Sequence, residues 1–252
     1  MDISLIETLR WEPAAGFVRL ERHLARLARS AAALGLAGSE GAEQALFAAL
    51  PPSALPRGEI GRGADPCSDA ALAVGETPLH PISPLAGEMP GRAEGGSPQG
   101  TPLRIRLELF PDGRIDIQMA PFTPLAPDAR WRLKIAGTRL SSADPMLRHK
   151  TSRRSVYTTA RAEVPATEAE EVILLNERGE LCEGTITSLF LDDGTGILKT
   201  PPLASGLLAG VLREELLGTG KAVEEILRPK DLAEGTAFVG NSLRGLIRGE
   251  LT

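Results

Sequence analysis

The sequence predicts an α+β protein of two domains, on three observations. Segments that alternate like strands and segments with helical spacing of apolar residues are mixed along the chain, without an internal repeat. Residues 121–129 are rich in proline and polar side chains, which is typical of a linker between domains. Hydrophobic residues make up 42% of the 252 positions, enough for a proper core. We therefore expect a smaller domain over 1–120 and a larger one over 130–252.

The smaller domain is predicted to combine strands with helices. Residues 21–36 carry apolar residues at helical spacing, and Gly35 or Gly38 can end that helix. Residues 103–110 and 114–119 read as a hairpin around a Pro-Asp-Gly turn. The other elements expected here are strands at 3–11 and 17–20 and a helix at 41–50.

The larger domain is predicted to alternate between the two kinds of element. The expected strands are 131–136, 171–176, 187–191, 222–227 and 237–240. The expected helices are 152–163, 211–217 and 229–232.

Residues 51–101 interrupt this pattern. Proline and glycine are dense in this segment and aromatic residues are absent. Such a composition opposes both helices and hydrogen-bonded strands. A loop of this length is unusual inside a compact domain. We expect a disordered insertion with no catalytic role.

Composition excludes several classes of function. The net charge of -5 opposes nucleic-acid binding, which needs a basic face. No apolar run reaches the ~20 residues of a membrane span, and no signal peptide is visible. The two cysteines form no disulfide or metal framework, and the three histidines are too scattered for a metal site. These observations favour a cytoplasmic protein that binds neither membrane nor metal.

Two segments carry residues that suit one cofactor. Lys150 follows a loop in His149-Lys150-Thr151, and Glu183 ends a short apolar run and begins Glu-Gly-Thr. A lysine amine can form a Schiff base with an aldehyde, and a carboxylate can hold a pyridine nitrogen protonated. Taken alone, a lysine is usually a solvated surface charge, and a glutamate at the end of a strand usually faces water.

These two segments resemble the fold-type IV enzymes that use pyridoxal phosphate. Within that superfamily the chain is most similar to 4-amino-4-deoxychorismate lyases, because Arg153-Arg154 follow the lysine segment as they do in those enzymes. The resemblance implies a small α/β domain followed by a larger pseudo-barrel domain. It also implies that Lys150 binds the cofactor aldehyde and that Glu183 holds its pyridine nitrogen. Ser188 departs from the family, where asparagine is common.

The resemblance implies contacts to the cofactor phosphate as well. Arg26 lies in a His-x-x-Arg-Leu-x-x-Ser-Ala helix whose arginine binds the phosphate in the family. The backbone amides of Val211 and Leu212, at the start of a helix, are expected to hold the same group. Helical spacing alone is equally compatible with Arg26 on a polar face, and the sequence before Val211 is a common helix entry.

Two further pairs of residues are candidates for the site. Asn241 and Ser242 match the last phosphate and substrate turn of the family, or they simply cap that turn. Thr8 and Arg10 lie on the first strand and are candidates to meet substrate carboxylates. In the family a hairpin precedes this strand, so either this subgroup lacks it or the start site lies upstream.

Three functions are compatible with these residues. The resemblance favours a lyase that eliminates pyruvate from 4-amino-4-deoxychorismate to give 4-aminobenzoate, a step towards folate. The alternative is a class IV aminotransferase for branched-chain or D-amino acids. A degenerate scaffold without cofactor is the third, which the retention of Arg26, Lys150 and Glu183 argues against. The resemblance also implies a homodimer.

Overall fold

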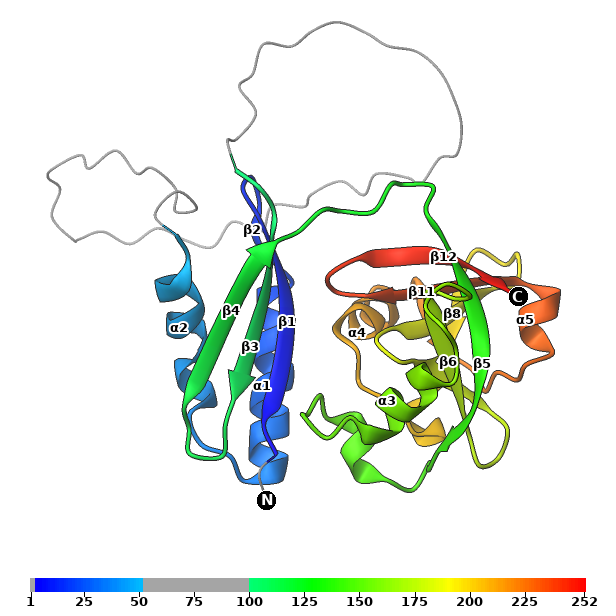
Figure 1. Ribbon diagram of the computed structural model, residues 1–252, viewed down its shortest axis with the longest axis horizontal. Coiled ribbons are helices and arrows are strands. Elements are labelled where there is room, and N and C mark those ends of the chain that lie inside the picture. The colour runs from blue at the N-terminus through cyan, green and yellow to red at the C-terminus, as the bar shows by residue number, and fades with distance from the viewer. Residues whose placement is uncertain (1–2, 52–99) are drawn as a thin grey trace, which may run out of the picture.

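The chain forms two domains that lie side by side, each built on its own sheet (Figure 1). This computed structural model describes residues 3–51 and 100–252. The segment expected to be an insertion, 51–101, lies almost entirely outside the described residues. No helix in the described part of the chain is long and apolar enough to cross a membrane.

The small domain is an antiparallel sheet covered on one face by two helices. Its strands run in the order β2-β1-β3-β4. The strands are β1 (Leu5–Glu12), β2 (Gly16–Val18), β3 (Leu103–Leu109) and β4 (Ile115–Pro121), and the helices are α1 (Leu20–Leu34) and α2 (Ala42–Ala49), joined by the short 3-10 helix η1 (Ser39–Gly41).

Alternation along β1 and β3 decides which face is buried. Leu5, Leu9 and Trp11 point towards the helices together with Ile105 and Leu107, and they form the small domain's core. Each such buried leucine contributes about 1.5–3 kcal/mol relative to an exposed one. The even-numbered residues of both strands therefore face the other domain. Helix α1 ends at Gly35, whose φ of 69° is one that glycine adopts without strain.

The large domain is a sheet closed on itself. Its strand order is β10-β9-β8-β11-β12-β5-β6-β7, and an additional pairing of β7 with β8 completes a ring from β8 to β7. The strands are β5 (Arg130–Leu140), β6 (Glu171–Asn176), β7 (Leu181–Gly184), β8 (Ser188–Asp192), β9 (Leu198–Thr200), β10 (Ala222–Glu224), β11 (Thr236–Asn241) and β12 (Gly245–Leu251). The predicted α+β architecture with a pseudo-barrel is thus confirmed.

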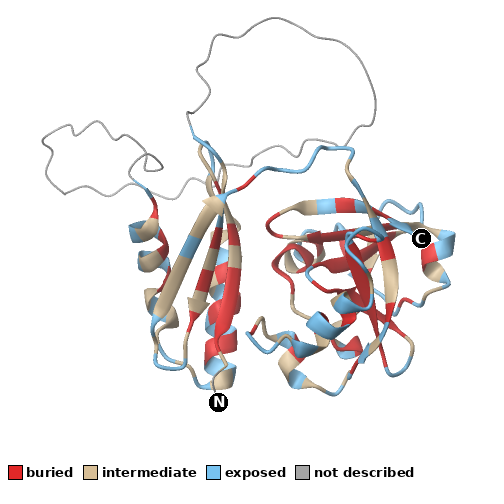
Figure 2. Ribbon diagram, in the orientation of Figure 1, coloured by how far each residue is buried: buried red, intermediate tan, exposed pale blue. Residues whose placement is uncertain are grey.

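Helices cover the outside of this barrel, and the connections carry 3-10 turns. They are α3 (Ser155–Ala162), α4 (Val211–Gly218), α5 (Asp231–Glu234), η3 (Pro145–Arg148) and η4 (Leu203–Ser205). Apolar residues such as Leu133, Ile173 and Val239 fill the barrel and are fully buried. Figure 2 shows buried residues concentrated along the barrel strands and between α1 and the small sheet.

Most predicted elements are present, with shifted ends. The strand predicted at 171–176 has those bounds, whereas the helix predicted from 152 begins at Ser155. The strand predicted at 131–136 continues past a bulge to Leu140, and the one predicted at 222–227 ends at Glu224. Strands β9 and β12 were not predicted, because β9 has only three residues and β12 is interrupted by glycine and charged side chains.

Candidate active site

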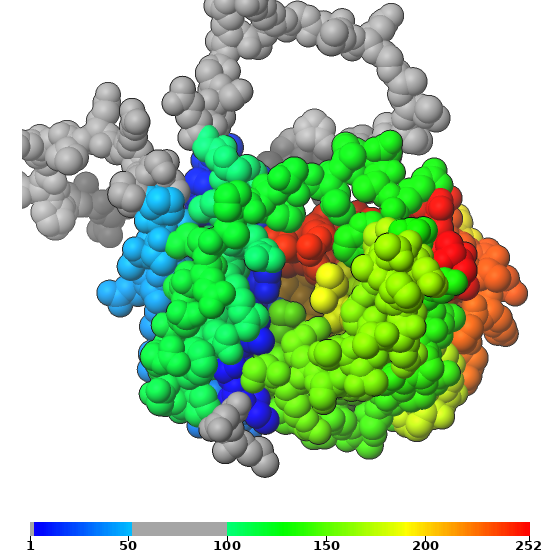
Figure 3. Space-filling view, in the orientation of Figure 1, coloured from blue at the N-terminus to red at the C-terminus, as the bar shows by residue number. Residues whose placement is uncertain are grey.

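A cavity of about 330 Å³ lies between the two domains. The space-filling view in Figure 3 shows the hollow between the small domain and the barrel. Its lining includes Thr8 and Arg26 from the small domain, and Lys150, Glu183 and Ser242 from the large one. Because both domains contribute residues, the site depends on how the domains are held together.

The loop that carries Lys150 is hydrogen-bonded to the small domain. The N–H of Ile6 donates to the carbonyl of Lys150 at 2.8 Å, and the N–H of Ser152 donates to the carbonyl of Ser4 at 2.9 Å. Leu5 and Thr151 form an antiparallel bridge between them. Strand β2 pairs only with residues 10–12 of β1, so the lysine loop uses the part of that edge which β2 leaves free.

Burial and neighbouring cations weaken the hold of Lys150 on its proton. Burial lowers the pKa of the Lys150 amine, and the charges of Arg26 and Arg154 lower it further, to about 8. Glu7 and Glu183 oppose this shift without cancelling it. A larger fraction of the amine is therefore uncharged near neutral pH than for an ordinary lysine, which favours both nucleophilic and base chemistry.

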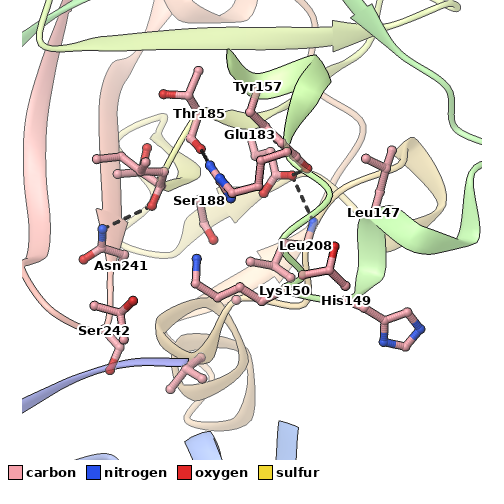
Figure 4. A pocket seen from close by; sticks show the side chains of 18 of the residues that line it. Leu147, His149, Lys150, Tyr157, Glu183, Thr185, Ser188, Leu208, Asn241 and Ser242 are labelled. Atoms are coloured by element: carbon pink, nitrogen blue, oxygen red, sulfur yellow. Dashed lines mark hydrogen bonds between the residues drawn. The ribbon is translucent and has the colours of Figure 1, made fainter. Parts of the chain in front are cut away.

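Glu183 lies near the end of β7 and points into the same cavity (Figure 4). Its Oε1 accepts hydrogen bonds from the Tyr157 hydroxyl at 2.7 Å and from the N–H of Leu208 at 3.1 Å. Its Oε2 accepts none from the described residues. Burial raises the pKa of Glu183 to about 7, although the two hydrogen bonds and the charge of Lys150 oppose that rise. A buried carboxyl of this kind would be stabilised as an anion by a cationic partner.

The start of α4 forms another part of the wall. Val211 and Leu212 line the cavity, and no side chain caps the helix start at Gly210. The first amides of a helix have no intrahelical acceptor, so they are available to an anion. A Cβ at Gly210 would lie 2.5 Å from Ser188 Oγ, so a larger residue there would force the Ser188 hydroxyl to move.

A buried polar cluster connects α1 to the large domain. Glu7 accepts hydrogen bonds from Arg26 Nε at 2.8 Å and Nη2 at 2.6 Å, and its Oε2 lies 2.6 Å from His23 Nδ1. Across the interface, His23 Nε2 lies 2.8 Å from Ser242 Oγ, and Arg26 Nη1 donates to the Ala209 carbonyl at 3.2 Å. Burial would raise the pKa of Glu7, but the charge of Arg26 and these hydrogen bonds lower it to about 2.

This cluster leaves Arg26 with capacity for a further anion. Three of the five N–H groups of its guanidinium are used by Glu7 and Ala209, so two remain without a partner among the described residues. The side chain is 6% exposed and lines the cavity, rather than lying on a solvated helix face.

The turn after β11 is fixed by Asn241. Its Nδ2 donates to the Ile186 carbonyl at 3.1 Å, and its Oδ1 accepts from the backbone N–H groups of Leu243 and Arg244. The side chain thus caps the turn, as the simpler interpretation of this residue predicts, and at the same time ties it to the β7–β8 loop. Asn241 and Ser242 both line the cavity.

The two candidates on β1 differ in position. Thr8 lines the cavity, whereas Arg10 is not part of the lining. The Arg10 guanidinium pairs with Glu12 and lies over the ring of Phe122, 5.4 Å from its centroid. Arg104, directly opposite Arg10 in the β1–β3 register, lines the cavity instead.

Comparisons with known proteins show which family the chain is similar to. A family model described as amino-transferase class IV matches residues 93–250. The structure titled "Putative amino-acid aminotransferase" from Mesorhizobium loti is 42% identical, with a TM-score of 0.75 and coverage of 100% of both chains.

The chain belongs to the class IV aminotransferase family.

Two curated relatives in this family have different names. The "Putative aminodeoxychorismate lyase" of Schizosaccharomyces pombe is 29% identical over 155 residues, which are 59% of this chain and 66% of that protein. The "Probable branched-chain-amino-acid aminotransferase" of Thermotoga maritima is 33% identical over 126 residues, which are 48% of this chain and 44% of that protein. The match therefore spans slightly less than two thirds of the length of the first relative and less than half of the length of the second.

Pyridoxal phosphate is the cofactor of class IV enzymes, and the residues of this cavity fit it. The Lys150 amine has a lowered pKa, which suits an aldehyde partner. The Oε2 of Glu183 has no hydrogen-bond donor among residues 3–51 and 100–252, and the carboxyl has a raised pKa, which suits a protonated ring nitrogen. The uncapped start of α4 suits a phosphate. The expected class of cofactor is confirmed by the family.

Several residues at or beside the site were not predicted from the sequence, among them Tyr157, Arg104 and Arg244 in the lining and Glu171 behind it. Glu171 begins β6, is fully buried, and accepts hydrogen bonds from three residues of the β7–β8 loop. The donors in that loop are Thr185 N at 3.0 Å, Thr185 Oγ1 at 2.6 Å, Ile186 N at 3.1 Å and Thr187 Oγ1 at 2.8 Å, and the N–H of Val172 donates as well, at 2.9 Å. A glutamate before an apolar run gives no sign of this role, because a solvated strand end has the same sequence.

Proposed function

We propose that this protein is a pyridoxal-phosphate-dependent 4-amino-4-deoxychorismate lyase, which eliminates pyruvate to give 4-aminobenzoate. The observation that carries the proposal is the placement of Lys150 and Glu183 in one cavity between the domains. The lyase is favoured over a branched-chain aminotransferase because Arg104, Arg153, Arg154 and Arg244 all line that cavity. Both products of the lyase carry a carboxylate, so its substrate carries two of them, whereas a branched-chain side chain needs an apolar surface.

The residues of the cavity would hold the cofactor at three places. Lys150 would bind its aldehyde carbon, and Glu183 would accept a hydrogen bond from its ring nitrogen. Arg26 and the amides of Val211 and Leu212 would bind its phosphate, with Ser242 beside them. When bound, pyridoxal phosphate supplies an aldehyde for the substrate amine and a ring that accepts an electron pair.

Lys150 would also act as the proton carrier of the reaction. Its Nζ takes the proton from the ring carbon that bears the amine. The carbon–oxygen bond to the enolpyruvyl group then breaks, the substrate ring becomes aromatic, and the departing enolate gains a proton to become pyruvate. The lowered pKa of Lys150 lets its amine accept this proton near neutral pH.

A class IV aminotransferase for branched-chain or D-amino acids is the second candidate. It is favoured by the 42% identity of the full-length Mesorhizobium loti structure, whose title describes an amino-acid aminotransferase. In that reaction Lys150 would carry a proton between substrate and cofactor carbons, and a keto acid would accept the amino group.

A product assay on protein loaded with pyridoxal phosphate tests the proposal. With aminodeoxychorismate generated in situ, we expect 4-aminobenzoate and pyruvate without any added keto acid. Formation of glutamate only when 2-oxoglutarate and an amino donor are both present would identify an aminotransferase. Lys150→Ala should reduce turnover about 10²–10⁴-fold, as loss of a positioned acid–base group does, and remove the near-visible absorbance of the bound cofactor. Full activity in that variant would overturn both candidates.

We also propose a homodimer in the cytoplasm. The support is the resemblance of the chain to class IV enzymes. Size-exclusion chromatography with light scattering tests the dimer, and a fully active monomer would contradict it.

A further inference from the structure

Two arginines of the cavity have no partner among the described residues. Arg104 on β3 and Arg244 after β11 both line the cavity, one from each domain. Neither guanidinium forms an ion pair or a hydrogen bond within residues 3–51 and 100–252. Arg244 has only a contact with the Trp131 ring, at 5.8 Å from its centroid.

The other arginines nearby are already engaged. Arg154 donates to the Thr185 carbonyl at 2.5 Å and lies over the Tyr157 ring, and Arg153 lies 3.8 Å from Asp144. On β3 itself, Arg106 pairs with Glu108 at 2.8 Å. The missing partners of Arg104 and Arg244 therefore distinguish them from their neighbours.

The fold holds both side chains at the cavity. Arg104 is opposite Arg10, whose guanidinium is occupied by Glu12 and Phe122. The turn that carries Arg244 is fixed by Asn241, whose Oδ1 accepts from the N–H of Arg244 at 2.9 Å. The two positions are thus set by a strand register and by a capped turn.

The positive charges of Arg104 and Arg244 repel each other. Burial lowers the pKa of Arg244, and the charge of Arg104 lowers it further, while Glu171 opposes the shift. Two cations that repel each other across a cavity are stabilised when an anion binds between them. Arginine offers paired donors that match the two oxygens of a carboxylate.

We propose that Arg104 and Arg244 form a carboxylate-binding subsite, which holds the substrate carboxylate remote from the reacting amine. Arg104 is exposed whereas Glu183 is buried, so the subsite lies on the solvent side of the cavity. In the proposed lyase reaction, on which this assignment rests, the bound group is the carboxylate that remains in 4-aminobenzoate. The subsite selects amines that carry an anionic group at the far end of the molecule.

Binding of 4-aminobenzoate to the protein loaded with cofactor tests the subsite by isothermal titration calorimetry. The neutral probe 4-aminobenzamide has nearly the same shape and no charge. We expect the wild type to prefer the carboxylate, and Arg104→Gln and Arg244→Gln each to weaken its binding about tenfold or more, with little effect on the amide. Arg104→Lys should retain part of the preference. Arg106→Gln is the matched control on the same strand and should bind both probes like the wild type.

The outcomes separate the subsite from the proposed function. If both Gln variants keep the wild-type affinity and KM while 4-aminobenzoate is still produced, the subsite is wrong and the lyase stands. If the carboxylate preference depends on both arginines but turnover requires a keto acid, the subsite stands and the lyase is wrong. Equal losses for both probes would reflect general damage to the cavity and would overturn the subsite.

Discussion

The amine of Lys150 and the carboxyl of Glu183 hold their protons with nearly equal strength. Burial brings the pKa of the first down to about 8 and that of the second up to about 7. The pKa values of ordinary lysine and glutamate side chains differ by about six. In this cavity a small change of charge, such as the arrival of a phosphate or a pyridinium, can therefore change the protonation of either group.

The raised pKa of Glu183 has a consequence for the cofactor-free protein. The folded state holds a proton between pH 4.5 and 7 that the unfolded state has released, so stability falls as pH rises through this range. We expect the free energy of unfolding to fall by about 3 kcal/mol over this range. Urea unfolding of wild type and Glu183→Gln at pH 5 and pH 8 measures it. The variant should lack this part of the pH dependence, and parallel profiles would contradict the assignment.

At the scale of elements, the β7–β8 loop is organised by Glu171. The carboxylate of this one residue binds backbone and hydroxyl donors of residues 185–187. The loop in turn offers its carbonyls to Arg154 and Asn241, which belong to other parts of the site. Glu171 is thus a positioning residue that acts through the loop.

Glu171→Gln should destabilise the protein and loosen the cofactor site. The amide can accept through one oxygen only, so at least one buried donor loses its partner, at a cost of about 1–3 kcal/mol. Urea unfolding and retention of pyridoxal phosphate during dialysis are the measurements. Glu170→Gln is the matched control. The Glu170 carboxylate, adjacent to Glu171 in the sequence, pairs with Arg132 at the surface, so its loss should change the free energy of unfolding little. Equal effects of the two substitutions would contradict a special role for Glu171.

The elements show what the sequence could predict and what it could not. Periodicity located α1 and β6, because both have long, regular apolar patterns. Strands β9 and β12 owe their pairing to neighbours far away in the chain, which no local pattern records. Motif resemblance led to Lys150 and Glu183, whereas the importance of Glu171 and Arg104 depends on contacts that only the folded chain creates.

At the scale of the whole molecule, the Glu7 cluster joins the two domains. Glu7 orients His23 and Arg26, which reach Ser242 and Ala209 in the large domain. These contacts are almost completely buried, so solvent screens them little. The cluster therefore fixes α1 against the side of the barrel where the phosphate is proposed to bind.

Glu7→Gln should cost about 3–5 kcal/mol, because it leaves the Arg26 charge buried without its partner. The wild type should also lose stability as the pH falls from 4.5 to 2, since the folded pKa lies below the unfolded one. Urea unfolding across this range measures both effects, and the variant should show a shallower decline. A change below ~1 kcal/mol would show that the cluster is not important for stability. Glu12→Gln, at the other end of the same strand, is the control, because its half-buried carboxylate pairs with Arg10 and does not contact Arg26.

The seam between Ser4–Ile6 and Lys150–Ser152 consists mainly of main-chain hydrogen bonds, to which the Ser152 hydroxyl adds one as an acceptor from the N–H of Ser4. This limits how the protein can diversify or be recombined with relatives. Side chains at positions 4–6 can be exchanged without removing those bonds. Insertion of one residue between Ile6 and Glu7 is different, because it would reverse which face every later residue of β1 presents. Glu7 would then point away from Arg26 while the lysine loop stayed in place. When the small domain is exchanged between relatives, we therefore expect an active protein if the number of residues in β1 is the same in both. Sequence identity along β1 should matter less.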